Sequence, residues 1–114
     1  MNLKDYVEKN QKIVAACNDR VPGNTYVDML FGTLDFATAR FHTCLIKLSQ
    51  DKIKEAELSN QVEASFHAIQ NFYHYTKKYQ DANIITQWVY KIILHGIGRN
   101  KIPKVKKLLN SLNN

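Results

Sequence analysis

Histidines and a cysteine are the side chains of this sequence that could most readily do chemistry. His67 and His74 stand seven residues apart in a segment with helical spacing, so they could share one face of a helix, with Glu63 one turn before His67. Two imidazoles and one carboxylate are a weak ligand set for a transition metal. We therefore expect ordinary surface or core-edge histidines and no metal site.

A nucleophile–base pair would require Cys44 to meet His42 or His95. A catalytic thiolate must be accessible, whereas Cys44 belongs to an apolar stripe and is expected to be buried. The Gly96-Ile97-Gly98 segment lacks the further glycines and the preceding strand of a phosphate-binding loop. We predict no catalytic residue, no cofactor and a protein that is not an enzyme.

Aromatic residues gather between positions 66 and 90 and alternate with lysines, an arrangement that can stack on single-stranded bases. More often such residues fill a core, with tyrosine hydroxyls at its rim. The residues concerned are Phe66, Phe72, Tyr73, Tyr75, Tyr79, Trp88 and Tyr90, with Lys77, Lys78 and Lys91.

The formal charge of +6 is unevenly placed along the chain. Residues 1–81 hold ten basic and ten acidic side chains, and no acid follows Asp81. This basic region could bind a nucleic acid or an acidic partner. It is equally explained by a solvated face and by the preference of helix C-termini for cations. Its members are Lys91, Arg99, Lys101, Lys104, Lys106 and Lys107.

Length and composition suit one domain over residues 1–114. The sequence has no apolar run of 18 residues, which predicts no membrane insertion, and its charged N-terminus lacks the apolar core of a secretory signal. We expect a cytoplasmic protein in which Cys17 and Cys44 are reduced and buried. Sequence alone leaves a disulfide between them open.

Helical periodicity runs through nearly the whole chain and has few breaks. It predicts an all-α fold, an antiparallel bundle of four to five helices. The expected helices cover about 2–18, 24–48, 52–77 and 84–94, and a last one begins near Pro103. We expect Asn24 or Thr25, and later Ser49 and Asp51, as caps, a polar link over 77–83, an end loosened by Gly96 and Gly98, and fraying after Leu112.

The helix over 24–48 carries apolar residues on more than the one stripe that a core requires. The second row includes Tyr26, Met29 and Phe36. These residues either face neighbouring helices as further core or form an open surface for another protein. We predict that they contact a partner.

Four segments of the sequence together match one pattern. They are PGNTYVDMLFGTL, QDKIKEAELSNQVEASFHAI, WVYKIILHGIGRN and KVKKLLNSL. Over about residues 21–112 the chain resembles the FliS type of flagellin export chaperone. The likeness rests on Pro22, Tyr26, Val27, Met29, Leu30, Phe31 and Gly32, on Asp51, Ile53, Val62, Ala64 and Ile69, on Trp88 and Tyr90, and on Val105, Leu108 and Leu109.

The resemblance implies a cytoplasmic chaperone that holds the C-terminal helical segment of flagellin, or of a similar secreted subunit, in apolar grooves and so prevents premature assembly. Amphipathic helices bind such grooves through anchors at helical spacing. Two other interpretations stay open: a small basic helical nucleic-acid-binding subunit, and another helical inhibitor or immunity module. The identity of the partner and the oligomeric state do not follow from the sequence.

Overall fold

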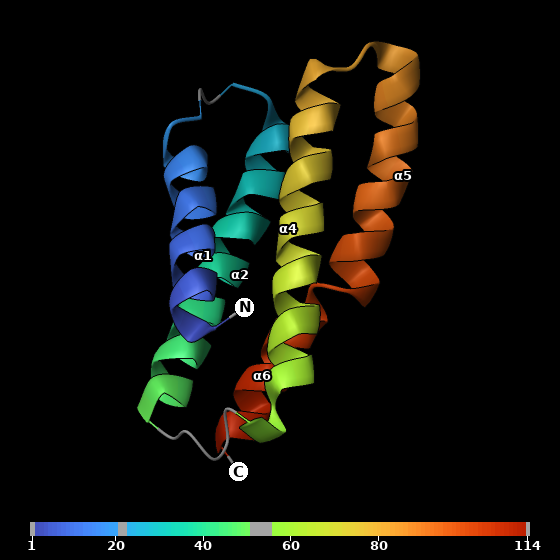
Figure 1. Cartoon of the computed structure of the whole chain (residues 1–114). Coiled ribbons are helices and arrows are strands. Elements are labelled where there is room, and N and C mark those ends of the chain that lie inside the picture. Colours follow the sequence, from blue (N-terminus) through green and yellow to red (C-terminus); the bar gives the residue numbers. More distant parts are fainter. Residues whose placement is uncertain (1, 21–22, 51–55, 114) are drawn as a thin grey trace.

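The computed structural model describes residues 2–20, 23–50 and 56–113, and in these residues it contains helices and no strand. The all-α prediction is therefore confirmed. The helices are α1 (Leu3–Asn18), α2 (Thr25–Gln50), α4 (Ser59–Asp81), α5 (Ile84–Asn100) and α6 (Pro103–Asn113). Figure 1 shows α1, α2, α4 and α5 alternating in direction, whereas α6 continues in the same direction as α5.

Asparagines begin three of these helices by accepting a hydrogen bond from a free backbone N–H of the first turn. Asn2 Oδ1 accepts from Asp5 N at 3.0 Å, and the Asp5 carboxylate accepts in return from Asn2 N. Asn24 Oδ1 accepts from the backbone of Val27 at 3.1 Å, which confirms it as a cap of α2. Asn83 plays the same part for α5.

Two helix boundaries differ from the sequence prediction in the same direction. The expected polar link over 77–83 is mostly the last turn of α4, because Tyr79 is buried there with its ring centroid 5.0 Å from that of Tyr26. Gly96 and Gly98 do not loosen α5, which continues to Asn100. In both places burial or neighbouring turns outweigh the local preference for a break.

The remaining boundary predictions are settled in part. Ser49 lies inside α2 and is not a cap, α6 extends to Asn113 instead of fraying after Leu112, and Pro103 is the first residue of α6 as expected. The helix expected from residue 52 begins at Ser59 in the described chain, after a short helical stretch at 56–57. Residues outside the described ranges that carried a prediction are Pro22, Asp51 and Ile53.

The core is built around α2, whose inner face is fully buried along its whole length. Phe41 forms an aromatic cluster with Tyr6 of α1 and Phe66 of α4, with ring centroids 5.3–6.3 Å apart. Cys17 and Cys44 are free and buried, so no disulfide joins them. The other fully buried side chains include Leu34, Leu45, Leu48, Ile69 and Leu108.

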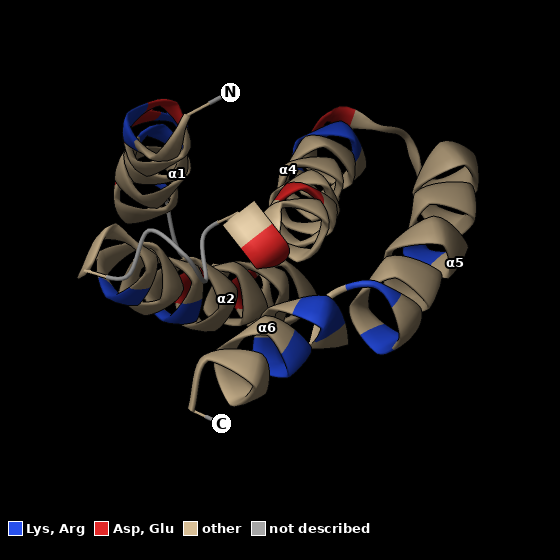
Figure 2. Cartoon of the chain, turned by 60° about the horizontal axis from the view of Figure 1, so that its bottom comes forward, with Lys and Arg blue, Asp and Glu red and all other residues tan. Residues whose placement is uncertain are grey.

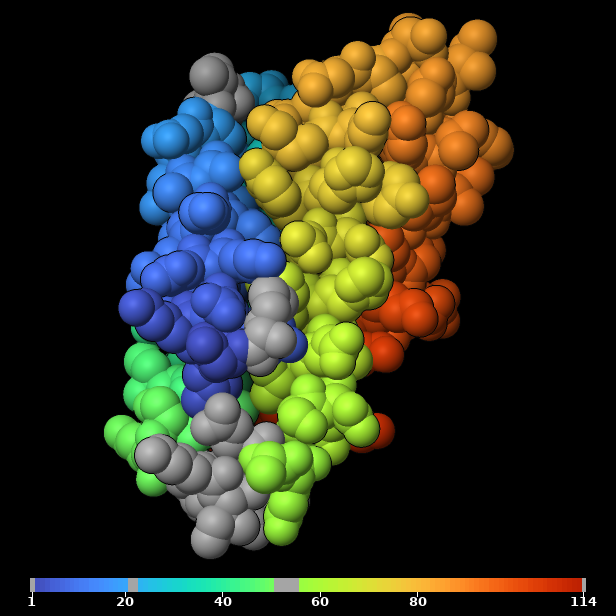
Figure 3. Space-filling view, viewed as in Figure 1, coloured from blue at the N-terminus to red at the C-terminus, as the bar shows by residue number. Residues whose placement is uncertain are grey.

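The helices form two layers, and α5 lies at the side of both. Figure 1 and the end-on view of Figure 2 agree that α1 and α4 form one layer, with α2 and α6 behind them. In the space-filling view of Figure 3, α5 (orange) projects beyond α4 at one upper corner. The molecule is elongated, with extents of 48 × 26 × 21 Å.

Candidate functional site

Helix α5 exposes an apolar face to solvent. Leu94 is its one buried residue, whereas Ile84 is 86% exposed and Trp88 is 70% exposed. Ile85, Val89 and Ile92 are exposed as well. A soluble protein rarely leaves so many large apolar side chains together on one helix, and such surfaces mark interaction sites.

The exposure follows from how α5 is held. It lies along α4 and meets α6 at its end. The Tyr75 and Tyr90 rings are 6.0 Å apart, and Gln87 Nε2 donates to the Tyr79 carbonyl at 3.0 Å. Near the other end the chain comes close to α4 at Gly98, where a Cβ would lie 3.3 Å from the Phe72 ring.

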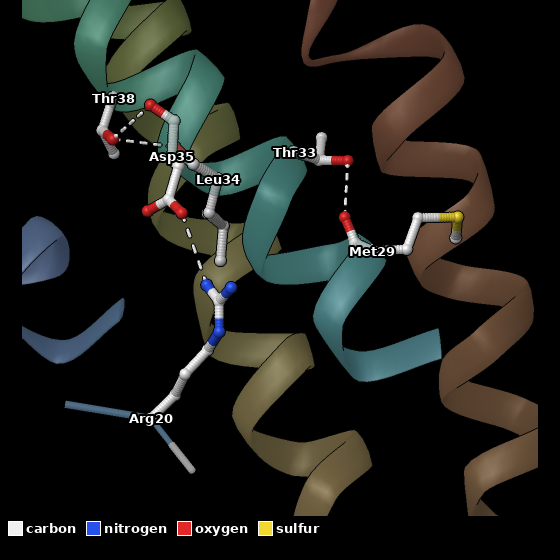
Figure 4. A network of polar contacts seen from close by, with 6 residues as sticks. All are labelled: Arg20, Met29, Thr33, Leu34, Asp35 and Thr38. Carbon is white, nitrogen blue, oxygen red and sulfur yellow. Dashed lines mark hydrogen bonds and ion pairs between the residues drawn. The ribbon is translucent and has the colours of Figure 1, made fainter. Parts of the chain in front are cut away.

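A groove of about 750 Å³ separates α2 from α5. Its apolar lining includes the buried side chains Leu30, Phe72 and Leu94 and the exposed side chains Met29, Trp88 and Ile92. Figure 4 shows Met29 projecting from α2 towards α5, with Thr33 donating to the Met29 carbonyl at 3.1 Å. We call this the α2–α5 groove.

Tyr26 lies at one end of the α2–α5 groove, where Lys91 reaches across from α5. The Lys91 Nζ lies 4.7 Å from the centroid of the Tyr26 ring, a cation–π contact between the two helices. The Tyr26 ring also packs against the Tyr79 ring of α4, with the centroids 5.0 Å apart. Desolvation raises the pKa of the Tyr26 hydroxyl, as expected for a half-buried phenol.

The three residues predicted to contact a partner are therefore placed differently. Tyr26 is half-buried and Met29 is 57% exposed, and both line the α2–α5 groove. Phe36 is 58% exposed but lies about two turns further along α2, outside the groove lining. Its ring is covered by the Arg40 guanidinium at 4.2 Å.

The sequence interpretation missed the groove wall that α5 supplies. Trp88 was grouped with aromatic residues expected in the core, and the structure shows it exposed. Phe66, Phe72 and Tyr79 of the same group are buried as expected. The sequence of α5 could have predicted this exposure, because its apolar residues lie on all sides of the helix. A helix on the outside of a bundle cannot bury side chains on all sides.

The basic residues of the C-terminal region lie at three different locations on the surface. Figure 2 shows Lys and Arg, and no Asp or Glu, along α5 and α6. Lys91 and Arg99 line the α2–α5 groove. Lys101 and Lys104 line a second hollow of about 520 Å³, next to His67 of α4. The remaining two, Lys106 and Lys107, are exposed on α6.

The candidate chemical residues do not assemble a reactive site. His67 and His74 are exposed, and no group of three metal-ligating side chains occurs in the part of the chain that the structure describes. Cys44 is fully buried, and this burial raises the pKa of its thiol to about 11. Buried thiols that keep their proton are poor nucleophiles, and Cys44 is of this kind.

Two polar contacts connect α1 and the residues after it to α2. Arg20, just after α1, pairs with Asp35 of α2 at 3.3 Å, as Figure 4 shows. Thr38 lies one turn after Asp35, and its hydroxyl donates to the Leu34 carbonyl at 2.7 Å. The side-chain amide of buried Asn10, in α1, donates to the Thr38 carbonyl. Both contacts fix the register of the two helices.

Comparison with known proteins leaves the groove as the main guide to function. No family model, no curated protein and no solved structure matches the chain. Within residues 2–20, 23–50 and 56–113, no helix combines the length and the apolar character needed to cross a membrane.

Proposed function

We propose that this protein is a chaperone that holds a helical segment of another protein in the α2–α5 groove. The observation that carries the proposal is the apolar face of α5, which stands opposite exposed Met29 and leaves a groove lined by buried leucines and a phenylalanine. Helix-in-groove binding needs such a hydrophobic channel between two walls. The proposal includes no catalytic step.

The energetics favour a client that covers more than the groove. Full burial of a large apolar side chain stabilises a complex by about 1.5–3 kcal/mol. Met29, Trp88 and Ile92 are 57–70% exposed, so covering them contributes together about 3–5 kcal/mol before the cost of association. A client that also covers Ile84 or Phe36 gains further binding free energy from these exposed side chains.

In its specific form, the proposal is a cytoplasmic export chaperone for the C-terminal helical segment of flagellin or of a similar secreted subunit. The sequence resemblance to the FliS type supports this form. So does the position of Tyr26 and Met29 in the groove and of Phe36 on the same helix. Such a chaperone covers the apolar helical surface of its client until export and thereby prevents assembly.

The test is a titration with the C-terminal segment of flagellin from the same organism, followed through the fluorescence of Trp88, the single tryptophan of the chain. Binding should move the Trp88 emission to shorter wavelength as water is excluded. Met29→Asp and Ile92→Asp should each abolish the change. Ile46→Asp is the matched control, because Ile46 is 45% exposed on α2 but lies outside the groove. Equal loss in all three variants would remove the groove from the proposal.

Nucleic-acid binding is the second candidate function, favoured by the absence of acidic side chains on α5 and α6. Changing Lys101, Lys104, Lys106 and Lys107 together to Gln should abolish such binding and leave the fold nearly unchanged, because charges at the surface contribute little each. Phosphate-dominated binding also weakens steeply with salt, whereas apolar groove binding does not. Tight salt-sensitive binding to RNA or DNA would favour this function over the chaperone.

A further inference from the structure

Two cationic side chains and a histidine between them form a row along the α5 wall of the α2–α5 groove. Lys91, His95 and Arg99 follow each other at four-residue intervals, about 6 Å apart along the helix, and all three are exposed and line the groove. Intervals of four place them on nearly the same side of α5. None of the residues that line the groove carries a carboxylate. The groove therefore has an apolar floor and a positively charged edge.

Nothing in the described chain neutralises this edge. Lys91 lies over the Tyr26 ring, which leaves its charge unpaired. The ion pair between Arg20 and Asp35 joins the segment after α1 to α2, and neither residue lines the groove. An occupant with negative charge beside its apolar anchors would complement the edge, and one with positive charge would be repelled.

Helix α6 shows how a helix lies against this part of the bundle. It packs on α2 and α4 through Val105, Leu108 and Leu112, which are all buried, and its lysines stay towards solvent. Figure 2 shows α6 between α2 and α5. The two helices that hold α6, α2 and α4, also contribute Met29 and Phe72 to the α2–α5 groove. A second short amphipathic helix could therefore pack in the α2–α5 groove in the same way as α6 packs on α2 and α4.

We infer that the α2–α5 groove takes an acidic amphipathic helix of about three turns, with apolar residues on one side and carboxylates beside them at four-residue intervals. The inference rests on the proposed function and specifies the class of client segment. The length follows from the groove wall, since Trp88 to Arg99 spans about 16 Å of α5. Helices α5 and α6 of a second copy are poor occupants, because both carry the same positive charge as the groove edge.

The experiment uses three synthetic peptides of one length that lack tryptophan. They share leucines at positions i, i+3, i+4, i+7 and i+11 and differ at the flanking positions, which are all Glu, all Gln or all Lys. Each is titrated into the full-length chain, and Trp88 fluorescence reports binding. We expect the Glu peptide to bind about tenfold more tightly than the Gln peptide at low salt, because two exposed ion pairs form, with Lys91 and Arg99. The difference should shrink at high salt.

Matched charge variants then locate the effect. Lys91→Gln with Arg99→Gln should remove the preference for the Glu peptide. Lys106→Gln with Lys107→Gln makes the same change of charge on exposed positions outside the groove and should leave the preference intact. If both double variants behave alike, the preference is a general effect of net charge and the inference is wrong.

The remaining outcomes separate this inference from the function on which it rests. Equal binding of all three peptides that Ile92→Asp or Met29→Asp abolishes would overturn the acidic client and keep the groove chaperone. No binding by any peptide, or binding that both variants leave unchanged, would overturn the chaperone as well. Sedimentation of the free chain and of its mixture with anionic phosphatidylserine vesicles covers two other occupants. Self-association or vesicle binding that Ile92→Asp removes would assign the groove to a second copy or to a membrane surface.

Discussion

Met29→Asp tests whether the α2 wall of the groove is open in the free protein. Met29 is 57% exposed, so less than half of its apolar surface contributes to stability. Full burial of methionine contributes at most about 3 kcal/mol, and the buried part of Met29 correspondingly about 1 kcal/mol. Aspartate in a helix costs up to about 0.7 kcal/mol more than a good helix former. The variant should therefore lose about 1–2 kcal/mol of unfolding free energy.

Leu34→Asp is the matched comparison, because Leu34 lies on the same helix and is fully buried. Placing a carboxylate there without a partner costs several kcal/mol. That loss is comparable with the whole stability of a domain, about 5–15 kcal/mol. We expect Met29→Asp to melt roughly 5–10 °C below the unaltered protein, and Leu34→Asp to be unfolded or aggregated.

Circular dichroism at the helical band during heating measures both variants. The two must differ clearly for the groove to exist as described. If Met29→Asp unfolds as completely as Leu34→Asp, then Met29 belongs to the packed core, and the reasoning that assigns it to a client surface fails.

Three further predictions concern the thiols, the glycines and the cap of α5. Burial raises the pKa of Cys17 and Cys44 to about 11 from 9.0, so the folded chain keeps protons that the unfolded chain releases. The free energy of unfolding should therefore fall as pH rises from about 9 to about 11, and denaturant titrations across that range measure it. Gly96→Ala, with open space around its Cβ, should raise the unfolding free energy by about 0.5–1 kcal/mol. Gly98→Ala should raise it less, because its Cβ would lie 3.3 Å from the buried Phe72 ring, and an equal gain in the two variants would contradict this. Asn83→Ala should cost about 1 kcal/mol through loss of its bond to the first turn of α5, and an unchanged melting temperature would exclude that role.

Much of the fold followed from local patterns. The 3.6-residue period of apolar residues predicted the helices, and Asn24 and Pro103 marked two helix starts correctly. The same logic identified Cys44 as buried. These features depend on neighbours along one helix, which a sequence displays directly.

The errors came from contacts between helices. The end of α4 extends into the predicted link because Tyr79 packs on Tyr26, more than fifty residues away in the chain. The exposed face of α5 was likewise hidden, because the apolar pattern of Trp88 and Ile92 is the same whether a partner helix belongs to the chain or to another protein. An apolar pattern predicts that a helix face is covered, but it does not distinguish a helix of the same chain from a partner protein.

The lack of fully buried side chains in the first half of α5 has a consequence for motion. Its first half is held by Gln87 and Tyr90 and buries no side chain completely, so it forms a small unit that can open without unfolding the rest. We expect the amide hydrogens from Ile84 to Tyr90 to exchange with solvent much faster than those around Phe41 in α2. An occupant that joins α5 to α2 slows this exchange, and part of its binding free energy is then used in ordering the wall against which it binds.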